Sequence, residues 1–120
     1  MPADHETVIA DLKAEVRSFC EARDWDQFHG PKDLAIGIAT EASELLELFR
    51  FATADDEADQ VTTPEARAAT EAELADVLIF VLRFAQRFDF DLSDAVRVKL
   101  AENETRYPAD EARGSNRKAP

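Results

Sequence analysis

The sequence has little cysteine, little glycine and few basic residues. Its one cysteine, Cys20, excludes a disulfide within the chain and fits a reducing compartment. Three glycines among many alanines, leucines and glutamates favour helices over sheets. Lysine and arginine number 14 against 26 acidic residues, which gives a net charge of −12. Such a chain is not expected to bind duplex DNA or an anionic membrane surface.

Long apolar runs are also missing. No stretch of about 18 apolar residues is present, so no membrane-spanning helix is expected, and no signal-peptide pattern follows Met1. We therefore expect a cytoplasmic protein. Because 45% of the residues are apolar, the chain can build a core of its own. One domain is predicted over residues 1–108, followed by a polar tail over residues 109–120.

Apolar residues at helical spacing predict an all-α fold with a four-helix core per subunit. The expected helices span about residues 4–22, 33–52, 64–88 and 94–106, with N-caps at Asp33, Thr63 and Ser93. The acidic segment between the second and third helices is interpreted as a solvated linker. It is short enough for these two helices to pack as antiparallel neighbours.

Two acidic pairs lie on these antiparallel helices, within otherwise apolar faces. Glu41 and Glu44 are three residues apart, as are Glu73 and Asp76, so each pair lies on one helix face beside apolar residues. Packing of the helices would bring four carboxylates together, at a cost of several kcal/mol in repulsion and desolvation. A cation that prefers oxygen ligands, such as Mg²⁺, Mn²⁺ or Ca²⁺, would compensate. The alternative is that all four are solvated surface residues.

Other metal and nucleotide motifs are missing. One cysteine and two histidines do not favour zinc. No Glu-x-x-His pair is present for a di-iron bundle, and no P-loop motif occurs. On the last predicted helix, however, Lys99, Asn103 and Arg106 share one face. They are suited to phosphate and sugar groups, although the two cations are also explained by the helix dipole and acidic neighbours.

Taken together, the motifs resemble the MazG-like nucleotide pyrophosphohydrolases, most closely their dCTP pyrophosphatase branch. The resemblance covers about residues 10–118. It rests on the aromatic loop at residues 23–29, the two acidic pairs, the Lys-x-x-x-Asn helix with Arg106-Tyr107-Pro108, and the tail at residues 112–118.

The resemblance implies a Mg²⁺ site formed by the two acidic pairs. It also implies that Lys99 and Asn103 contact the nucleotide, with Trp25 and His29 near the base or sugar. It further implies a homotetramer, a dimer of dimers, with sites between subunits. Two positions depart from the dCTP branch, which has Trp where Phe51 stands and Tyr where Phe80 stands. Stacking survives both changes, but the lost hydroxyl leaves the choice of base open.

The resulting hypothesis is a Mg²⁺-dependent pyrophosphohydrolase that converts dCTP or a related nucleotide into a monophosphate and pyrophosphate. Glu44 would orient or deprotonate the water, and Lys99 would stabilise charge on the phosphates. Substrate binding is assigned to a larger set: Trp25, His29, Phe51, Phe80, Lys99, Asn103 and Arg106. The alternative is a non-catalytic helical oligomerisation module whose acidic pairs bind a partner. Surplus apolar residues on several helix faces favour subunit contacts in either case.

Overall fold

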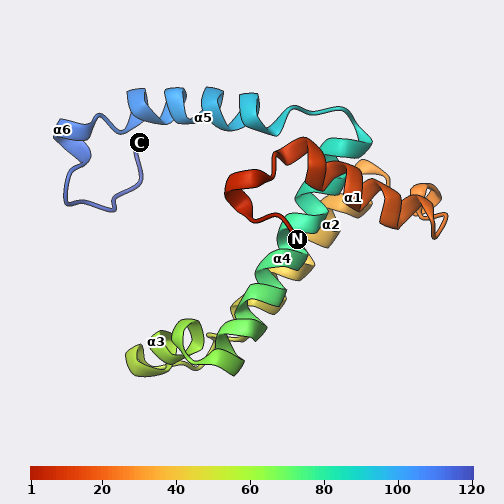
Figure 1. Ribbon diagram of the computed structural model, residues 1–120. Coiled ribbons are helices and arrows are strands. Elements are labelled where there is room, and N and C mark those ends of the chain that lie inside the picture. Colours follow the sequence, from red (N-terminus) through yellow and green to blue (C-terminus); the bar gives the residue numbers. More distant parts are fainter. The chain divides into compact units, whose positions relative to one another are not determined.

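The computed structural model describes residues 1–120, which form helices and no strands, so the all-α prediction is confirmed (Figure 1). The chain divides into two compact units, Met1–Asp89 and Phe90–Pro120, which are described separately. No helix combines the length and the apolar character needed to cross a membrane. The helices are α1 (Ile9–Glu21), α2 (Pro31–Glu47), α3 (Ala54–Thr62), α4 (Pro64–Arg87), α5 (Leu92–Arg106) and α6 (Ala109–Ala112), with 3₁₀ turns at Asp4–Glu6 and Asp26–Phe28.

Helix α4 is the axis of the first unit. It packs along α2, and α1 and α3 also pack against it (Figure 1). The two long helices are antiparallel: Gly37 of α2 faces Phe80 of α4, and further along α2 the glutamates face earlier residues of α4. A Cβ atom at Gly37 would lie 2.3 Å from the Phe80 ring, so glycine is what allows this close approach. The buried apolar residues are Cys20, Leu34, Leu82 and Ala85.

Three helix starts test the predicted caps. Helix α4 begins as predicted, after Thr63, with proline at its first position. The prediction of Asp33 as an N-cap is wrong: Pro31 opens α2, and Asp33 sits at the third helical position, where its carboxylate accepts from the Gly30 N–H at 3.3 Å. Ser93 is also not the cap of α5, because the Asp91 carboxylate accepts from the Asp94 N–H at 2.9 Å.

The segment predicted to be a linker is largely helical and forms α3. The Thr53 hydroxyl accepts from the Asp56 N–H at 3.3 Å, and the Asp56 carboxylate accepts from the Thr53 N–H at 3.1 Å. Acidic residues in the first turn also interact favourably with the helix dipole. Gln60 then donates to the Thr70 hydroxyl at 3.1 Å, which ties α3 to α4. The acidic composition therefore marks a helix start and not a loop.

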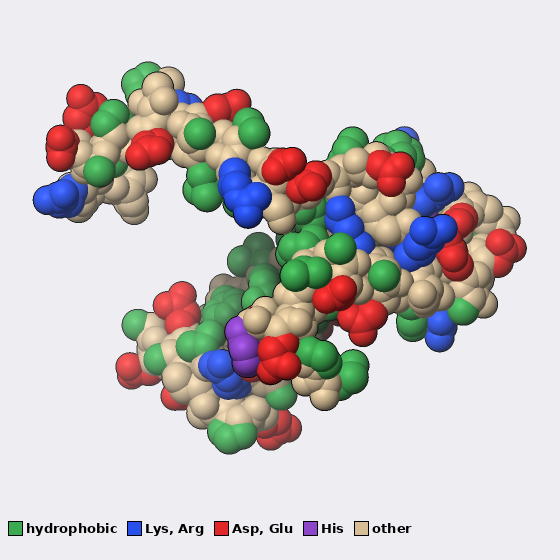
Figure 2. All heavy atoms as spheres, turned by 45° about the horizontal axis from the view of Figure 1, so that its top comes forward, with side chains coloured by type: hydrophobic (Ala, Val, Ile, Leu, Met, Phe, Trp, Pro, Cys, Tyr) green, Lys and Arg blue, Asp and Glu red, His purple; other side chains and the backbone are tan.

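The second unit is thin. Helix α5 buries none of its residues, and Val96, Val98 and Leu100 are each more than half exposed. The polar tail contains the short helix α6, and the Ala119 N–H donates to the Tyr107 hydroxyl at 2.8 Å. A single domain over residues 1–108 stays a prediction. Hydrophobic side chains show between the charged ones on the surface (Figure 2).

Candidate metal centre

The two acidic pairs meet between α2 and α4. Glu41, Glu44, Glu73 and Asp76 each offer one carboxylate oxygen, and these four atoms lie within 4.8 Å of one another. The i,i+3 spacing places each pair on one face of its helix, and the antiparallel packing turns the two faces toward each other. Glu41 and Glu73 are half-buried, whereas Glu44 is exposed. The structure therefore contains the four-carboxylate cluster that the spacing predicts.

The cluster is electrostatically unfavourable by itself. Hydrogen bonding to Glu44, then burial, then the neighbouring negative charges raise the pKa of Glu41. Burial, followed by the charges of Glu44 and Asp76, raises the pKa of Glu73. The Oε2 atoms of Glu41 and Glu73 are buried and have no hydrogen-bond partner. Buried polar atoms are normally paired, so these two oxygens call for a ligand that neutralises charge.

The ligand set indicates which cation fits. All four candidate ligands are carboxylates, with no histidine or cysteine among them. Oxygen-only sets suit Mg²⁺, Mn²⁺ and Ca²⁺, and they do not favour zinc. Since one acidic residue of each helix remains more accessible than the buried oxygens, a bound cation could also be reached by a charged molecule from solvent. The cluster is thus suited to hold a hard divalent cation.

Phe80 occupies the next turn of α4 on the same face as the cluster. It lies four residues after Asp76, and its ring packs against Gly37 of α2. Three residues further along this face stands Arg83, which is only 1% exposed. Seven residues of helix rise about 10 Å, so Arg83 lies about 10 Å along α4 from Asp76. One helix face therefore links the carboxylates to a second polar group.

Arg83 anchors the aromatic loop to α4. Its Nε–H donates to Nδ1 of His29 at 2.9 Å, its Nη1 donates to Oε1 of Gln86 at 2.6 Å, and its Nη2 forms an ion pair with Asp26. The Arg83 guanidinium, as hydrogen-bond donor, lowers the pKa of Asp26. A buried guanidinium is stable only when its donors are paired, and here three acceptors surround it. The loop that carries Trp25 is therefore held in place by an ion pair between the buried Arg83 and the partly exposed Asp26.

The contact with Arg83 also determines the protonation state of His29. Burial, followed by the positive charge of Arg83, lowers the pKa of His29, so the imidazole is neutral at pH 7. Because Nδ1 accepts from Arg83, the proton resides on Nε2, which is then a donor. Trp25 packs edge-on against His29, with ring centroids 6.1 Å apart, and remains 39% exposed. The loop thus presents an aromatic surface and one N–H donor.

Arg83 was not among the residues singled out from the sequence. The sequence does contain an indication of its importance, because Arg83 is the one polar residue in the run from Val77 to Ala85. A charge in such a run is either exposed or paired inside. Its partners Asp26 and His29 lie 57 and 54 residues away in sequence, so the pairing itself was not readable from local spacing.

The other predicted site residues lie apart from this face or in the second unit. Phe51 follows α2 and is 84% exposed, with the Arg50 guanidinium 4.8 Å from its ring centre. On α5, the Lys99 ammonium donates a hydrogen bond to the Glu102 carboxylate at 3.1 Å, and Asn103 is half-buried. The Arg106 guanidinium lies 5.5 Å from the ring centre of Tyr107. Their roles at a substrate stay predictions.

Comparison with known proteins adds an independent line of evidence. The sequence profile of the MazG-like family matches residues 36–119, about two-thirds of the chain. The chain is 41% identical to human dCTP pyrophosphatase 1 over 113 residues, which cover 94% of this chain and 66% of that protein. It is 38% identical to the mouse protein of the same name, over 92% of this chain and 65% of the relative. The chain therefore spans just under two-thirds of the length of these relatives.

A solved structure resembles the fold as well as the sequence. The crystal structure of a pyrophosphatase from Archaeoglobus fulgidus superposes with a TM-score of 0.78 at 32% identity. The similarity covers 90% of this chain and 99% of that one. The family match over residues 36–119 includes most of α2, with Glu41 and Glu44, and all of α4, and it continues into the second unit.

Proposed function

Because this chain belongs to the MazG-like family, we propose that it is a nucleoside triphosphate pyrophosphohydrolase that depends on a divalent cation. The observation that carries the proposal is the four-carboxylate cluster with two buried, unpartnered oxygens, on Glu41 and Glu73. Substrate phosphates are anionic and would be repelled by bare carboxylates, so a cation between them is required. Mg²⁺ is proposed because it commonly joins carboxylates to nucleotide phosphates, and Mn²⁺ fits the same ligands.

The proposed reaction cleaves the bond between the α- and β-phosphates. A water oxygen bonds to the α-phosphorus, the bridging oxygen leaves with the pyrophosphate, and the proton of the water passes to a carboxylate. Glu44 is assigned this last role because it is the exposed glutamate of the cluster and can be reached by water. The bound cation supplies charge neutralisation and polarisation of the phosphate oxygens. The products are a nucleoside monophosphate and pyrophosphate.

The nucleoside end of the substrate is assigned to the aromatic loop. Phe80 lies between the carboxylates and Arg83 on one face of α4, so the loop and the cluster are separated by about the span of a nucleoside. Trp25 offers a stacking surface, and Nε2–H of His29 offers a donor to a base or sugar oxygen. The similarity to relatives named dCTP pyrophosphatase 1 supports dCTP or a related deoxynucleotide as the substrate of this chain.

The second unit and the assembly complete the proposal. Lys99, Asn103 and Arg106, which share a face of α5, are proposed to bind the phosphates, with Lys99 stabilising the charge that develops on them. Exposed apolar side chains on α2, α4 and α5 support subunit contacts, and we propose a homotetramer in the cytoplasm. Such an enzyme would remove unwanted nucleotides from the cellular pool.

The decisive experiment measures pyrophosphate release from a panel of nucleoside triphosphates with Mg²⁺. We expect release from at least one deoxynucleotide and none in excess EDTA. Glu44→Ala and Asp76→Ala should each lower turnover on the order of 10³-fold, because each removes a carboxylate of the cluster. Glu47→Ala is the matched control, since Glu47 lies on the same helix and is exposed. Circular dichroism would verify that each variant is folded; full activity of either cluster variant would disprove the assignment.

The non-catalytic oligomerisation module remains the competing hypothesis, supported by the exposed apolar side chains. It predicts no stabilisation by nucleotide. Thermal melts with dCTP, dTTP and dATP in the presence of Mg²⁺ separate the two, because an enzyme is stabilised by the substrate that it binds. No shift with any nucleotide, together with no turnover, would favour the module.

A further inference from the structure

Four cations at the C-terminal end of the chain form no ion pair, and three of them line one pocket. Several other cations of the chain pair with carboxylates, as in the ion pairs of Arg17, Arg50, Arg67, Arg97 and Lys99, whereas Arg23, Lys32 and Arg87 form no ion pair. Arg106, Arg117 and Lys118 form no ion pair in the structure. Their position around one pocket gives this segment a positive charge that contrasts with the net charge of −12 of the whole chain.

These cations line one pocket. Beyond α5 the chain turns back on itself, and the Ala119 N–H donates to the Tyr107 hydroxyl at 2.8 Å, which closes a hook over residues 107–119. Inside the hook, the Ser115 N–H donates to the Ala112 carbonyl at 3.0 Å and the Arg117 N–H donates to the Ser115 hydroxyl at 3.3 Å. The pocket that the hook encloses with the end of α5 measures about 470 Å³. It lies wholly within the second unit.

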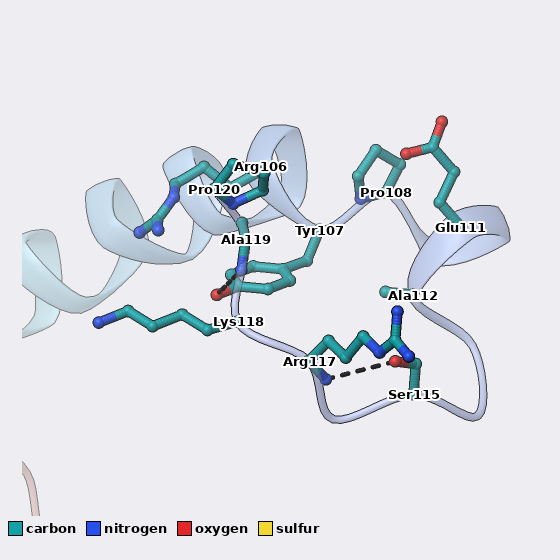
Figure 3. Close-up of a pocket in the computed structure, with 10 residues that line it drawn as sticks. All are labelled: Arg106, Tyr107, Pro108, Glu111, Ala112, Ser115, Arg117, Lys118, Ala119 and Pro120. Carbon is teal, nitrogen blue, oxygen red and sulfur yellow. Dashed lines mark hydrogen bonds between the residues drawn. The ribbon is translucent and has the colours of Figure 1, made fainter.

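The side chains around the pocket are arranged by charge. Figure 3 shows the Arg106 and Lys118 side chains extending to the same side of the hook, while Arg117 extends into the loop. Glu111, the one acidic residue of the lining, turns its carboxylate outward in that view. Three cations therefore line the pocket, and the carboxylate of Glu111 points away from them, an arrangement that an anion would complete.

We propose that this hook binds a pyrophosphate group, either free or as the terminal two phosphates of a nucleoside triphosphate. Two guanidinium groups and one ammonium group supply several donors and three positive charges, which suits a doubly phosphorylated group better than a single carboxylate. The identity of the phosphate compound rests on the proposed function, but the site itself does not. Arg106 ends the face of α5 that carries Lys99 and Asn103, so the hook extends that face by two more cations.

The test is titration calorimetry with sodium pyrophosphate in EDTA, where the carboxylate cluster holds no cation and repels the ligand. We expect the intact chain to bind, with an affinity that falls as salt rises. Arg117→Ala and Lys118→Ala should each weaken binding about tenfold, as expected for the loss of one charge-assisted contact. Arg113→Ala is the matched control, because Arg113 is exposed, lies in the same segment and does not line the pocket.

The outcomes separate the source of the group from the existence of the site. If Lys118→Ala also raises the KM for dCTP without changing kcat, the hook holds the substrate; if pyrophosphate inhibition alone weakens, it holds the free product. No binding in EDTA, or equal weakening by Arg113→Ala, would overturn the proposal. Failure of the proposed function shows differently: no nucleotide would be hydrolysed, while pyrophosphate would still bind to the hook.

Discussion

Two polar clusters share one face of α4, and they differ in whether their buried atoms have partners. Around Arg83, opposite charges and neutral acceptors are mixed, and the guanidinium donates to three groups. Around Glu41 and Glu73, four groups of the same charge meet, and two buried oxygens have no partner. A satisfied cluster stabilises the fold as it stands, whereas an unsatisfied one requires a ligand from outside. The comparison therefore distinguishes a cluster that positions the aromatic loop from the cluster that we propose to bind a cation.

Replacement of Arg83 should produce the largest loss of stability. Arg83→Met keeps much of the side-chain volume but removes the partner of Asp26 and His29, so we expect a loss of about 3 kcal/mol in the free energy of unfolding. Urea denaturation measures it. Arg87→Met, one turn further along α4 at an exposed position, is the control and should change stability by less than about 0.5 kcal/mol. Equal small effects of both variants would show that the Arg83 cluster does not hold the loop.

Binding of a cation to the acidic cluster should increase the stability of the chain, whereas replacement of Arg83 lowers it. Mg²⁺ at a hundred times its Kd should stabilise the chain by about 2.7 kcal/mol, because it binds the folded state alone. Thermal melts in Mg²⁺ and in EDTA at matched ionic strength measure the shift. Asp76→Asn should remove most of it, and Arg83→Met should leave it intact. An equal response to Mg²⁺ in the Asp76 variant would place the cation elsewhere.

Without cation, removal of one charge from the acidic cluster should be stabilising. Glu41→Gln relieves repulsion by Glu44 and Asp76, so the melting temperature in EDTA should rise by about 2–4 °C. Glu47→Gln, exposed on the same helix, should leave it nearly unchanged. A fall in melting temperature for Glu41→Gln would mean that the four carboxylates are already compensated within the protein.

The smallest expected effect is a pH dependence that originates at His29. Its pKa in the folded state lies below the ordinary value of 6.5 because of burial and the charge of Arg83, while Asp26, Asp33 and Arg87 act more weakly. Below about pH 6.5 the unfolded chain therefore takes up a proton that the folded one does not, and stability falls with falling pH until the folded pKa is reached. His29→Gln retains an acceptor for Arg83 and should show a shallower fall in melting temperature between about pH 7.5 and pH 5. An unchanged slope would contradict the assignment.

Local features of the fold were predictable from the sequence, and the predictions that were wrong also concerned local features. Helical spacing indicated the long helices, and Thr63-Pro64 marked the start of α4. The acidic stretch after Thr53 was misinterpreted as a linker because acidic side chains are common both in loops and in the first turn of helices. Asp33 and Ser93 were misassigned as caps because a cap is defined by backbone geometry, which a neighbouring proline or aspartate can shift by two or three residues.

The sequence by itself determined that two acidic pairs lie on two helix faces, because i,i+3 spacing is a property of the helix alone. A connection short enough to make α2 and α4 antiparallel then brought the pairs together. Only the tertiary structure decided which of their oxygens are buried without partners, since that depends on every neighbour at once. It also decided that Arg83 meets Asp26 and His29 across more than 50 residues, and that the tail closes on Tyr107. Such long-range contacts follow from packing, which no local pattern encodes.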